Sequence, residues 1–157
     1  MFEQINNFFT IEMIYLWLNL GVLPFWIVLF FFPYSFMSKY LVRSIFPFMI
    51  FSFVYVYLLY YFFISEFNFQ NNFTLYLGLE NLLDLFSEKG FLIMFWCHFL
   101  SINLFCGAWI VSDSIKLSIS KFLTFLPLLV TYFIGPLGLF MYWLIRIFFA
   151  RRMSLYD

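Results

Sequence analysis

The sequence predicts an all-α integral membrane protein, a bundle of four transmembrane helices with a short interfacial amphipathic helix between the second and third spans. Hydrophobic residues make up 66% of the 157 residues and charged residues only 10%. That is too few charges to cover the surface of a soluble domain, so lipid must be the solvent. Four apolar runs are each long enough to cross a bilayer as a helix. Between the second and third runs the pattern becomes amphipathic.

The boundaries of the four spans follow from the apolar runs and from their punctuation by proline and glycine. The first run stops at Pro33. Pro47 lies near the start of the second, where its missing N–H costs little, and Gly90 precedes the third. An even number of spans places both termini on one side of the membrane. The predicted spans are 11–32, 45–64, 91–111 and 122–149, within a single membrane domain over 1–157.

The segment between the second and third spans predicts the amphipathic helix. Its leucines recur at helical spacing, and its acidic residues occupy another face at intervals of four. This acidic face is interpreted as a solvated surface, and a lid over a site between the helices is the alternative. The apolar positions are Leu79, Leu82, Leu83 and Phe86, and the acidic positions are Glu80, Asp84 and Glu88.

Composition excludes several classes of function. The formal net charge is zero, so no basic patch for nucleic acid is expected. His98 is the single histidine, which excludes the histidine-rich di-iron enzymes and haem held by two histidines of one chain. Cys97 and Cys106 lie in the same apolar segment and are interpreted as small core residues. No metal or other cofactor is therefore expected.

Polar residues inside a span are costly and often mark a functional site. In the first span Glu12, Asn19 and Trp26 are seven residues apart and lie close to one helical face. Pro24, within the same helix, leaves the carbonyl of Leu20 without its usual partner. The alternative to a ligand site is a kink whose asparagine bonds to a neighbouring helix.

The fourth span also contains a proline that frees a backbone carbonyl. Pro136 frees the carbonyl of Tyr132, four residues earlier. Gly135 and Gly138 allow another helix, or a flat ligand, to approach the backbone. Kinking and close helix packing are the alternative explanation.

The third span carries the stretch WCHFLSINLFCGAWIVSD, residues 96–113. His98 is a candidate proton donor or acceptor, because a histidine pKa can lie near neutrality. A helix-to-helix hydrogen bond is the alternative for His98, and an interfacial position is the alternative for Asp113. The two residues lie about 22 Å apart along a helix axis, at about 1.5 Å per residue, and cannot touch.

The stretches NLGVLPFW, FFFP, WCHFLSINLFCGAWIVSD and IGPLGLFMYWLIR follow one another between residues 19 and 147. In this order and spacing they resemble the abscisic-acid-deficient-four-like family of small four-helix membrane proteins, and the chain is similar to bacterial-type members. Two positions depart from the family pattern: Asn103 stands where an acid is expected and Ala108 where a basic residue is expected. The matching positions are Asn19, Pro24, Trp26, Pro33, Trp96, His98, Gly107, Trp109, Asp113, Gly135, Pro136 and Gly138.

The resemblance implies a role in forming the allenic xanthophyll neoxanthin from the epoxide violaxanthin. That isomerisation needs an acid for the epoxide oxygen and a base for a vinylic proton, and no redox cofactor. His98 is the candidate for one role, and Asp113 or Glu12 for the other. A flat polyene suits an aromatic groove with close backbone approach. The expected ligand-binding residues are Asn19, Trp26, Trp96, Asn103, Trp109, Gly135, Pro136 and Gly138.

The first functional hypothesis is therefore a membrane protein that binds a carotenoid or other isoprenoid, with isomerisation of a xanthophyll epoxide as its reaction. The second is a non-enzymatic scaffold or subunit of a pigment-processing complex, with a homo-oligomer or a membrane partner left open. A transporter or channel is disfavoured, because no span carries a string of charged residues. The scarcity of alanine indicates an AT-rich genome, and the expected location is a bacterial inner membrane or an organelle membrane.

Overall fold

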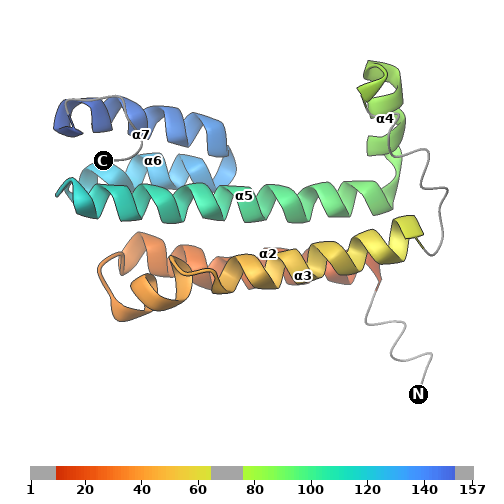
Figure 1. Cartoon of the computed structure of the whole chain (residues 1–157), viewed down its shortest axis with the longest axis horizontal. Helices are drawn as coiled ribbons and strands as arrows, with labels where there is room; N and C mark the ends of the chain where they lie inside the picture. The colour runs from red at the N-terminus through yellow and green to blue at the C-terminus, as the bar shows by residue number, and fades with distance from the viewer. Residues whose placement is uncertain (1–9, 65–75, 151–157) are drawn as a thin grey trace. The chain divides into compact units, whose positions relative to one another are not determined.

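A computed structural model describes residues 10–64 and 76–150 of the chain. Its regular elements in this part are helical, so the all-α prediction is confirmed there (Figure 1). Two short π-helical segments flank the second long helix, η1 (Ser38–Val42) and η2 (Tyr60–Ile64). The α-helices are α2 (Ile11–Phe31), α3 (Phe46–Leu59), α4 (Leu79–Ser87), α5 (Lys89–Lys116), α6 (Lys121–Phe133) and α7 (Gly135–Ala150).

Three helical segments in the described ranges are long and apolar enough to cross a membrane: Ile11–Phe31, Ser38–Phe62 and Lys89–Lys116. They correspond to the first three predicted spans. The second starts earlier than predicted because it includes η1, and the third is longer at both ends. Large apolar side chains cover much of their outer surface, with Phe53 at 69% exposure as an example. Such a surface fits a hydrocarbon environment better than water.

The described residues group into two compact units. Unit 1 consists of those within Met1–Gly21 and Met49–Leu100, and unit 2 of those within Val22–Phe48 and Ser101–Asp157. The first part of α2 and of α5 therefore belongs to unit 1, and the remainder to unit 2. The single domain over 1–157 stays a prediction.

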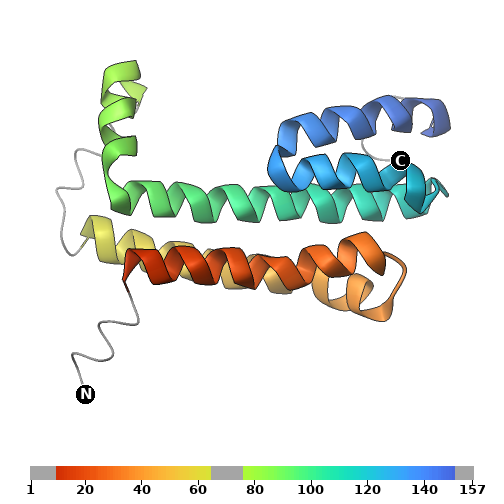
Figure 2. The ribbon, with the colours of Figure 1, turned by 180° about the vertical axis from the view of Figure 1, so that it is seen from behind.

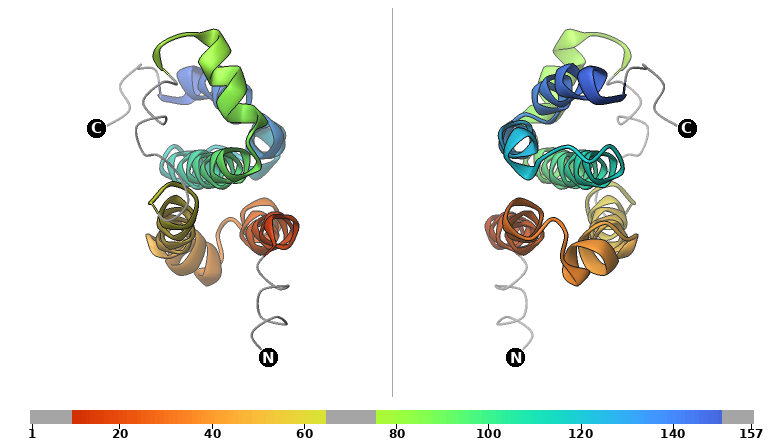
Figure 3. Two further views of the ribbon diagram at one scale, coloured as in Figure 1. Left: turned by 90° about the vertical axis from the view of Figure 1, so that its right-hand side faces the viewer. Right: turned by 90° about the vertical axis from the view of Figure 1, so that its left-hand side faces the viewer.

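The predicted fourth span over 122–149 needs correction, because it is two helices. Ile134 leaves helical geometry with φ −140° and ψ 83°, and α7 then runs back alongside α6 (Figures 1 and 2). The end-on views of Figure 3 show the two helices again as neighbours. With 13 and 16 residues, α6 and α7 are about 20 Å and 24 Å long at about 1.5 Å per residue. Each is shorter than a hydrocarbon core of about 30 Å.

The Gly135–Pro136 pair explains the break. Proline disfavours helical geometry in the residue before it and cannot donate to the carbonyl four residues earlier. At the second position of a new helix the missing N–H costs nothing, because the first N–H groups of a helix have no intrahelical partner. The pair therefore starts α7, where the sequence suggested a kink.

Gly138 sets the close approach of the two helices. A Cβ at this position would collide with Oγ1 and the backbone N of Thr131 and would lie 2.6 Å from the carbonyl oxygen of Pro127. The Thr131 hydroxyl donates a 2.7 Å hydrogen bond to that same oxygen. The two helices therefore pack backbone to backbone here, as small residues allow in membranes.

The predicted amphipathic helix is present as α4, and none of its residues is buried. Phe86 packs edge-on against Phe91 and Phe95 of α5, with ring centroids 5.2 Å and 4.8 Å apart. Glu88 departs from the prediction, since it follows the helix with extended geometry (φ −80°, ψ 122°). The location of α4 at a membrane interface stays a prediction.

Gly138→Ala should destabilise the fold by about 1–3 kcal/mol, the usual cost of overpacking. Gly21→Ala is the matched control, because no atom lies within 4 Å of a Cβ built there. It should be neutral or stabilising by up to about 1 kcal/mol, since alanine is the better helix former. Thermal unfolding of both variants in one detergent measures this. Equal midpoints for the two variants would contradict the packing described.

Candidate functional site

Unit 1 contains a pocket of about 440 Å³ between the start of α2 and the start of α5. This volume is within the range of about 300–1,000 Å³ typical of ligand sites. The walls are mainly apolar, and charged groups come from one residue of each helix. The lining residues are Ile11, Glu12, Tyr15, Lys89, Leu92, Ile93 and Trp96.

The sequence builds this pocket through helical periodicity. Positions 11, 12 and 15 lie on one face of α2, and positions 89, 92, 93 and 96 lie on one face of α5, because residues three and four apart are neighbours on a helix. Glu12 faces Lys89 near the beginning of both helices, and Asn19 faces Trp96 farther along. In unit 1 the two helices therefore run in the same direction.

A hydrogen-bond relay fixes the indole at the inner end of the pocket. Trp96 Nε1–H donates to Oδ1 of Asn19 at 3.3 Å, and Nδ2 of Asn19 donates to the carbonyl of Tyr15 at 2.7 Å. The rings of Tyr15 and Trp96 have centroids 5.8 Å apart. The indole N–H is thereby satisfied by protein, and the ring is held as one wall of the pocket.

An ion pair stands at the rim. Lys89 Nζ lies 3.6 Å from Oε1 of Glu12, and both side chains are more than 70% exposed. An exposed pair of this kind contributes little to stability. It does place one proton donor and one carboxylate beside an apolar cavity. Among the predicted site residues, the structure brings Glu12, Asn19 and Trp96 together here.

The sequence did not single out Lys89 and Tyr15. Lys89 falls outside the predicted span over 91–111. The signal that could have found it is its spacing from Trp96, which equals the spacing of Glu12 from Asn19.

His98 lies in unit 1 but away from this pocket. Its side chain is exposed on α5, and its ring centroid is 6.4 Å from that of Tyr55 on α3. Within the described residues no hydrogen bond or ion pair joins His98 to Glu12. Its catalytic role stays a prediction.

Asn103 binds backbone at the break between α6 and α7 in unit 2. It is only 3% exposed, and its Nδ2 donates to the carbonyl of Tyr132 at 3.4 Å. This is the carbonyl that Pro136 leaves without a donor, as the sequence predicts. A Cβ on Gly135 would collide with Oδ1 of Asn103, so glycine makes room for the amide.

Trp26 packs beside this contact and is 1% exposed. Its ring lies edge-on to Tyr132 with centroids 5.3 Å apart. A Cβ on Gly107 of α5 would lie 2.7 Å from Cη2 of the indole. Trp26 therefore fills the space that Gly107 leaves open.

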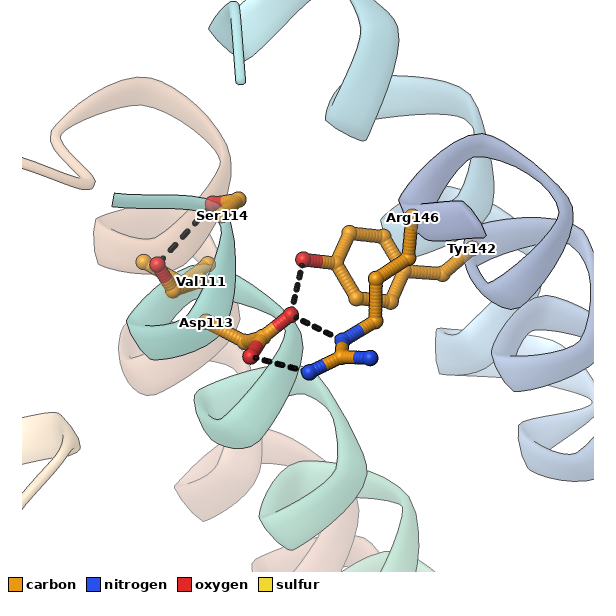
Figure 4. Close-up of polar contacts among 5 residues, drawn as sticks. All are labelled: Val111, Asp113, Ser114, Tyr142 and Arg146. Carbon is orange, nitrogen blue, oxygen red and sulfur yellow. Dashed lines mark hydrogen bonds and ion pairs between the residues drawn. The ribbon is translucent and has the colours of Figure 1, made fainter. Parts of the chain in front are cut away.

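Asp113 forms a buried ion pair that is shown in Figure 4. Nε of Arg146 lies 2.8 Å from Oδ2, Nη2 lies 3.4 Å from Oδ1, and the Tyr142 hydroxyl donates to Oδ2 at 2.7 Å. The three residues are at most 8% exposed, so Asp113 is buried within unit 2. Its position relative to the membrane interface stays a prediction. Trp109 lies edge-on to Tyr142 with centroids 5.7 Å apart. The carboxylate is neutralised by a partner on α7.

Tyr142 and Arg146 are not among the predicted site residues, although both lie within the predicted span over 122–149. Their spacing of four residues places both on one face of α7, together with Gly135 and Gly138. A charged residue on the buried face of an apolar helix requires a partner. That partner is Asp113.

The sequence profile of the ABA DEFICIENT 4-like family matches residues 13–142, which is most of the chain. The protein belongs to the ABA DEFICIENT 4-like family. Searches of curated proteins and of solved structures gave no match to the chain.

The region matched to the ABA DEFICIENT 4-like family contains Asn19, Trp96, Asn103 and Asp113. Glu12 precedes it and Arg146 follows it. The two ion pairs of the protein are therefore each completed by a residue outside the matched segment, as far as the described residues show.

Arg146→Met should destabilise this ABA DEFICIENT 4-like protein by about 3–5 kcal/mol, because it leaves a buried carboxylate without its counter-charge. The double variant Asp113→Leu with Arg146→Met should recover most of the loss, although the Tyr142 hydroxyl then lacks its acceptor. Ile147→Met, an exposed neighbour on α7, is the control. Thermal unfolding in detergent is the measurement. A double variant no more stable than Arg146→Met would show that the unpaired Asp113 carboxylate is not the cause of the loss.

Proposed function

We propose that the protein is an integral membrane protein, of a bacterial inner membrane or an organelle membrane, that binds the oxygenated end of a carotenoid or related isoprenoid in the pocket of unit 1. The three long apolar helices support the membrane location. Membership of the ABA DEFICIENT 4-like family, which is linked to neoxanthin synthesis, supports the class of ligand.

The observation that carries the proposal is the pocket itself, which joins an apolar interior to a charged rim. Tyr15 and Trp96 offer aromatic faces for a terminal ring, while Glu12 and Lys89 stand where a ring oxygen would lie. The cavity suits one end ring of a long polyene. The remaining chain of the ligand would extend into lipid along the helices.

The reaction we propose is isomerisation of an epoxide to an allenic alcohol. The Lys89 ammonium gives a proton to the epoxide oxygen as the ring C–O bond breaks, and the Glu12 carboxylate takes the vinylic proton whose electron pair forms the new double bond. Product and substrate have the same atoms and electrons. Glu12 then returns the proton to Lys89, 3.6 Å away, so the pair is regenerated without an external reactant.

A scaffold without catalytic activity is the second candidate. The contacts in unit 2 favour it, because Asn103 and Asp113 are each engaged by protein groups. Polar groups that are satisfied in this way organise a fold without needing a substrate.

Leu92→Trp should reduce the bound pigment by at least about tenfold, equivalent to about 1.4 kcal/mol of binding free energy, because the indole would occupy the pocket. Ile102→Trp is the matched control, since Ile102 is also a half-exposed apolar residue of α5 and does not line the pocket. Each variant is purified in mild detergent from a host that makes xanthophylls. The absorption spectrum and the extracted pigment are then measured.

A stoichiometric polyene on the wild type and on Ile102→Trp, lost from Leu92→Trp, is the expected result. An allenic product in place of the host's epoxide would support the isomerase, and an unchanged epoxide would favour the scaffold. A colourless wild-type protein from a pigment-rich membrane would refute the binding proposal.

A further inference from the structure

We infer that α6 and α7 form a re-entrant hairpin that enters and leaves the membrane on one side, and that the basic end of unit 2 on that side contacts the anionic headgroups of the cytoplasmic leaflet. The inference rests on the membrane location proposed above. It does not depend on the pigment or on any reaction.

The direction of α7 follows from its contacts with α5. Gly135, at the start of α7, lies against Asn103, whereas Arg146, eleven residues later, binds Asp113. The helix therefore runs in the same direction as the second half of α5. Its later turns approach the level of Lys116, where α5 ends.

α6 must start at that same end, because only four residues separate it from α5. It runs back toward the middle of α5, since Tyr132 near its end lies against Asn103. Asn103 is about 20 Å from Lys116 along α5, whose 28 residues span about 42 Å at about 1.5 Å per residue. The turn at Ile134 is thus level with the middle of the long helix.

A chain reversal at that depth must satisfy its own backbone, because no water is present in the hydrocarbon core. The Asn103 amide serves the freed Tyr132 carbonyl, and the N–H of Ile134 donates to the carbonyl of Val130 at 2.7 Å. Gly138 N–H donates to the carbonyl of Ile134 at 3.1 Å. These bonds satisfy the carbonyl of Tyr132 and both backbone groups of Ile134 at the turn.

The end of unit 2 that carries the helix termini is basic. α2 also runs toward it, because Trp26 packs on Gly107 and Phe30 packs on Phe125 of α6, nearer the α6 start. The turn that follows α2 therefore lies at this end. Among the described residues, the lysines and arginines at this end are Lys39, Arg43, Lys116, Lys121 and Arg146, and Lys89 at the start of α5 is the remaining one.

With four spans, the eight lysines and arginines of the sequence divide four against four between the two sides and leave the orientation open. A single helix over 122–149 would carry Arg146 to the opposite side. The hairpin returns it to the basic end, where it is buried against Asp113. The four described cations of this end that are not buried are Lys39, Arg43, Lys116 and Lys121, whereas Lys89 stands at the start of α5. The positive-inside rule then assigns the basic end to the cytoplasm.

The side chains at this end suit lipid headgroups. Lys39 Nζ lies 5.0 Å from the ring centroid of Tyr40, and Lys121 Nζ lies 5.5 Å from that of Phe122. Both rings are exposed, at 56% and 82%. An aromatic ring with a cation beside it is typical of a membrane interface, where the cation reaches the phosphates.

Cysteine labelling tests the inference on the full chain in bacterial cells. Ser118→Cys lies between α5 and α6, Phe148→Cys lies in the last turns of α7, and Glu88→Cys precedes α5. All three positions are exposed. Phe122→Cys repeats the Ser118 measurement if that variant folds poorly, and the wild type, with Cys97 and Cys106, gives the background.

A membrane-impermeant maleimide should label Glu88→Cys in intact spheroplasts, and Ser118→Cys and Phe148→Cys only after permeabilisation. Labelling of positions 118 and 148 from opposite sides would overturn the hairpin, and labelling of both from outside would overturn the orientation. If the protein does not fractionate with membranes, the proposed membrane location itself is wrong. This outcome distinguishes a failure of the proposed function from a failure of the hairpin inference.

The headgroup contact has its own readout. In vesicles, the wild type should unfold at a higher temperature in phosphatidylglycerol than in phosphatidylcholine, and the Lys39→Gln, Lys121→Gln double variant should lose most of this difference. An equal difference in both proteins would remove the headgroups as partners of this surface.

Discussion

The arrangement of α6 and α7 on α5 depends on one hydrogen bond, which the Asn103 amide donates to the Tyr132 carbonyl at the turn between the two helices. Inside hydrocarbon every backbone polar group needs a partner from the protein. Pro136 removes the usual donor for this carbonyl, so the carbonyl needs another donor from the protein. Asn103 supplies the replacement, and Gly135 leaves the space that its side chain occupies. A rare polar residue in the middle of α5 is thereby explained by the backbone it serves.

The position of α7 follows from this contact and from a second one ten residues along α5. Asn103 holds the beginning of α7, and Asp113 holds Arg146 nearer its end. The ion pair has to overcome the cost of removing two charges from water, so its contribution is better understood as fixing register than as adding stability. Between these contacts Gly138 lets α7 lie directly on α6. The two polar contacts, near the start and near the end of α7, together with Gly138 between them, therefore specify how these apolar helices pack.

Much of this could be predicted from the sequence, and the exceptions share a cause. Long apolar runs fix the first three spans, and proline chemistry identifies the free carbonyl of Tyr132. Helical spacing also places Glu12 and Asn19 on one face. In the structure Glu12 lines the pocket and Asn19 bonds the indole of Trp96, which also lines it. Helical periodicity cannot distinguish a kink from a chain reversal at Gly135–Pro136, because both leave the same pattern of apolar residues. The contacts that determine the reversal join residues far apart in the sequence, such as Asn103 with Tyr132. For the same reason, helical spacing alone does not pair Lys89 with Glu12 or Arg146 with Asp113. His98 stands out by residue type, although it does not line the pocket.

The two units divide the chemistry of this ABA DEFICIENT 4-like protein. Unit 2 uses its polar groups for architecture, whereas unit 1 presents a cavity with a charged rim.

The most direct measurement is a pulsed-EPR distance between nitroxides at positions 122 and 148, which are exposed and lie near the outer ends of α6 and α7. Two packed helices that fold back should hold the labels within about 25 Å, given an interaxial distance of about 8–10 Å. A distance near 39 Å, the length of 26 residues at about 1.5 Å each, would mean one continuous helix and would contradict the account.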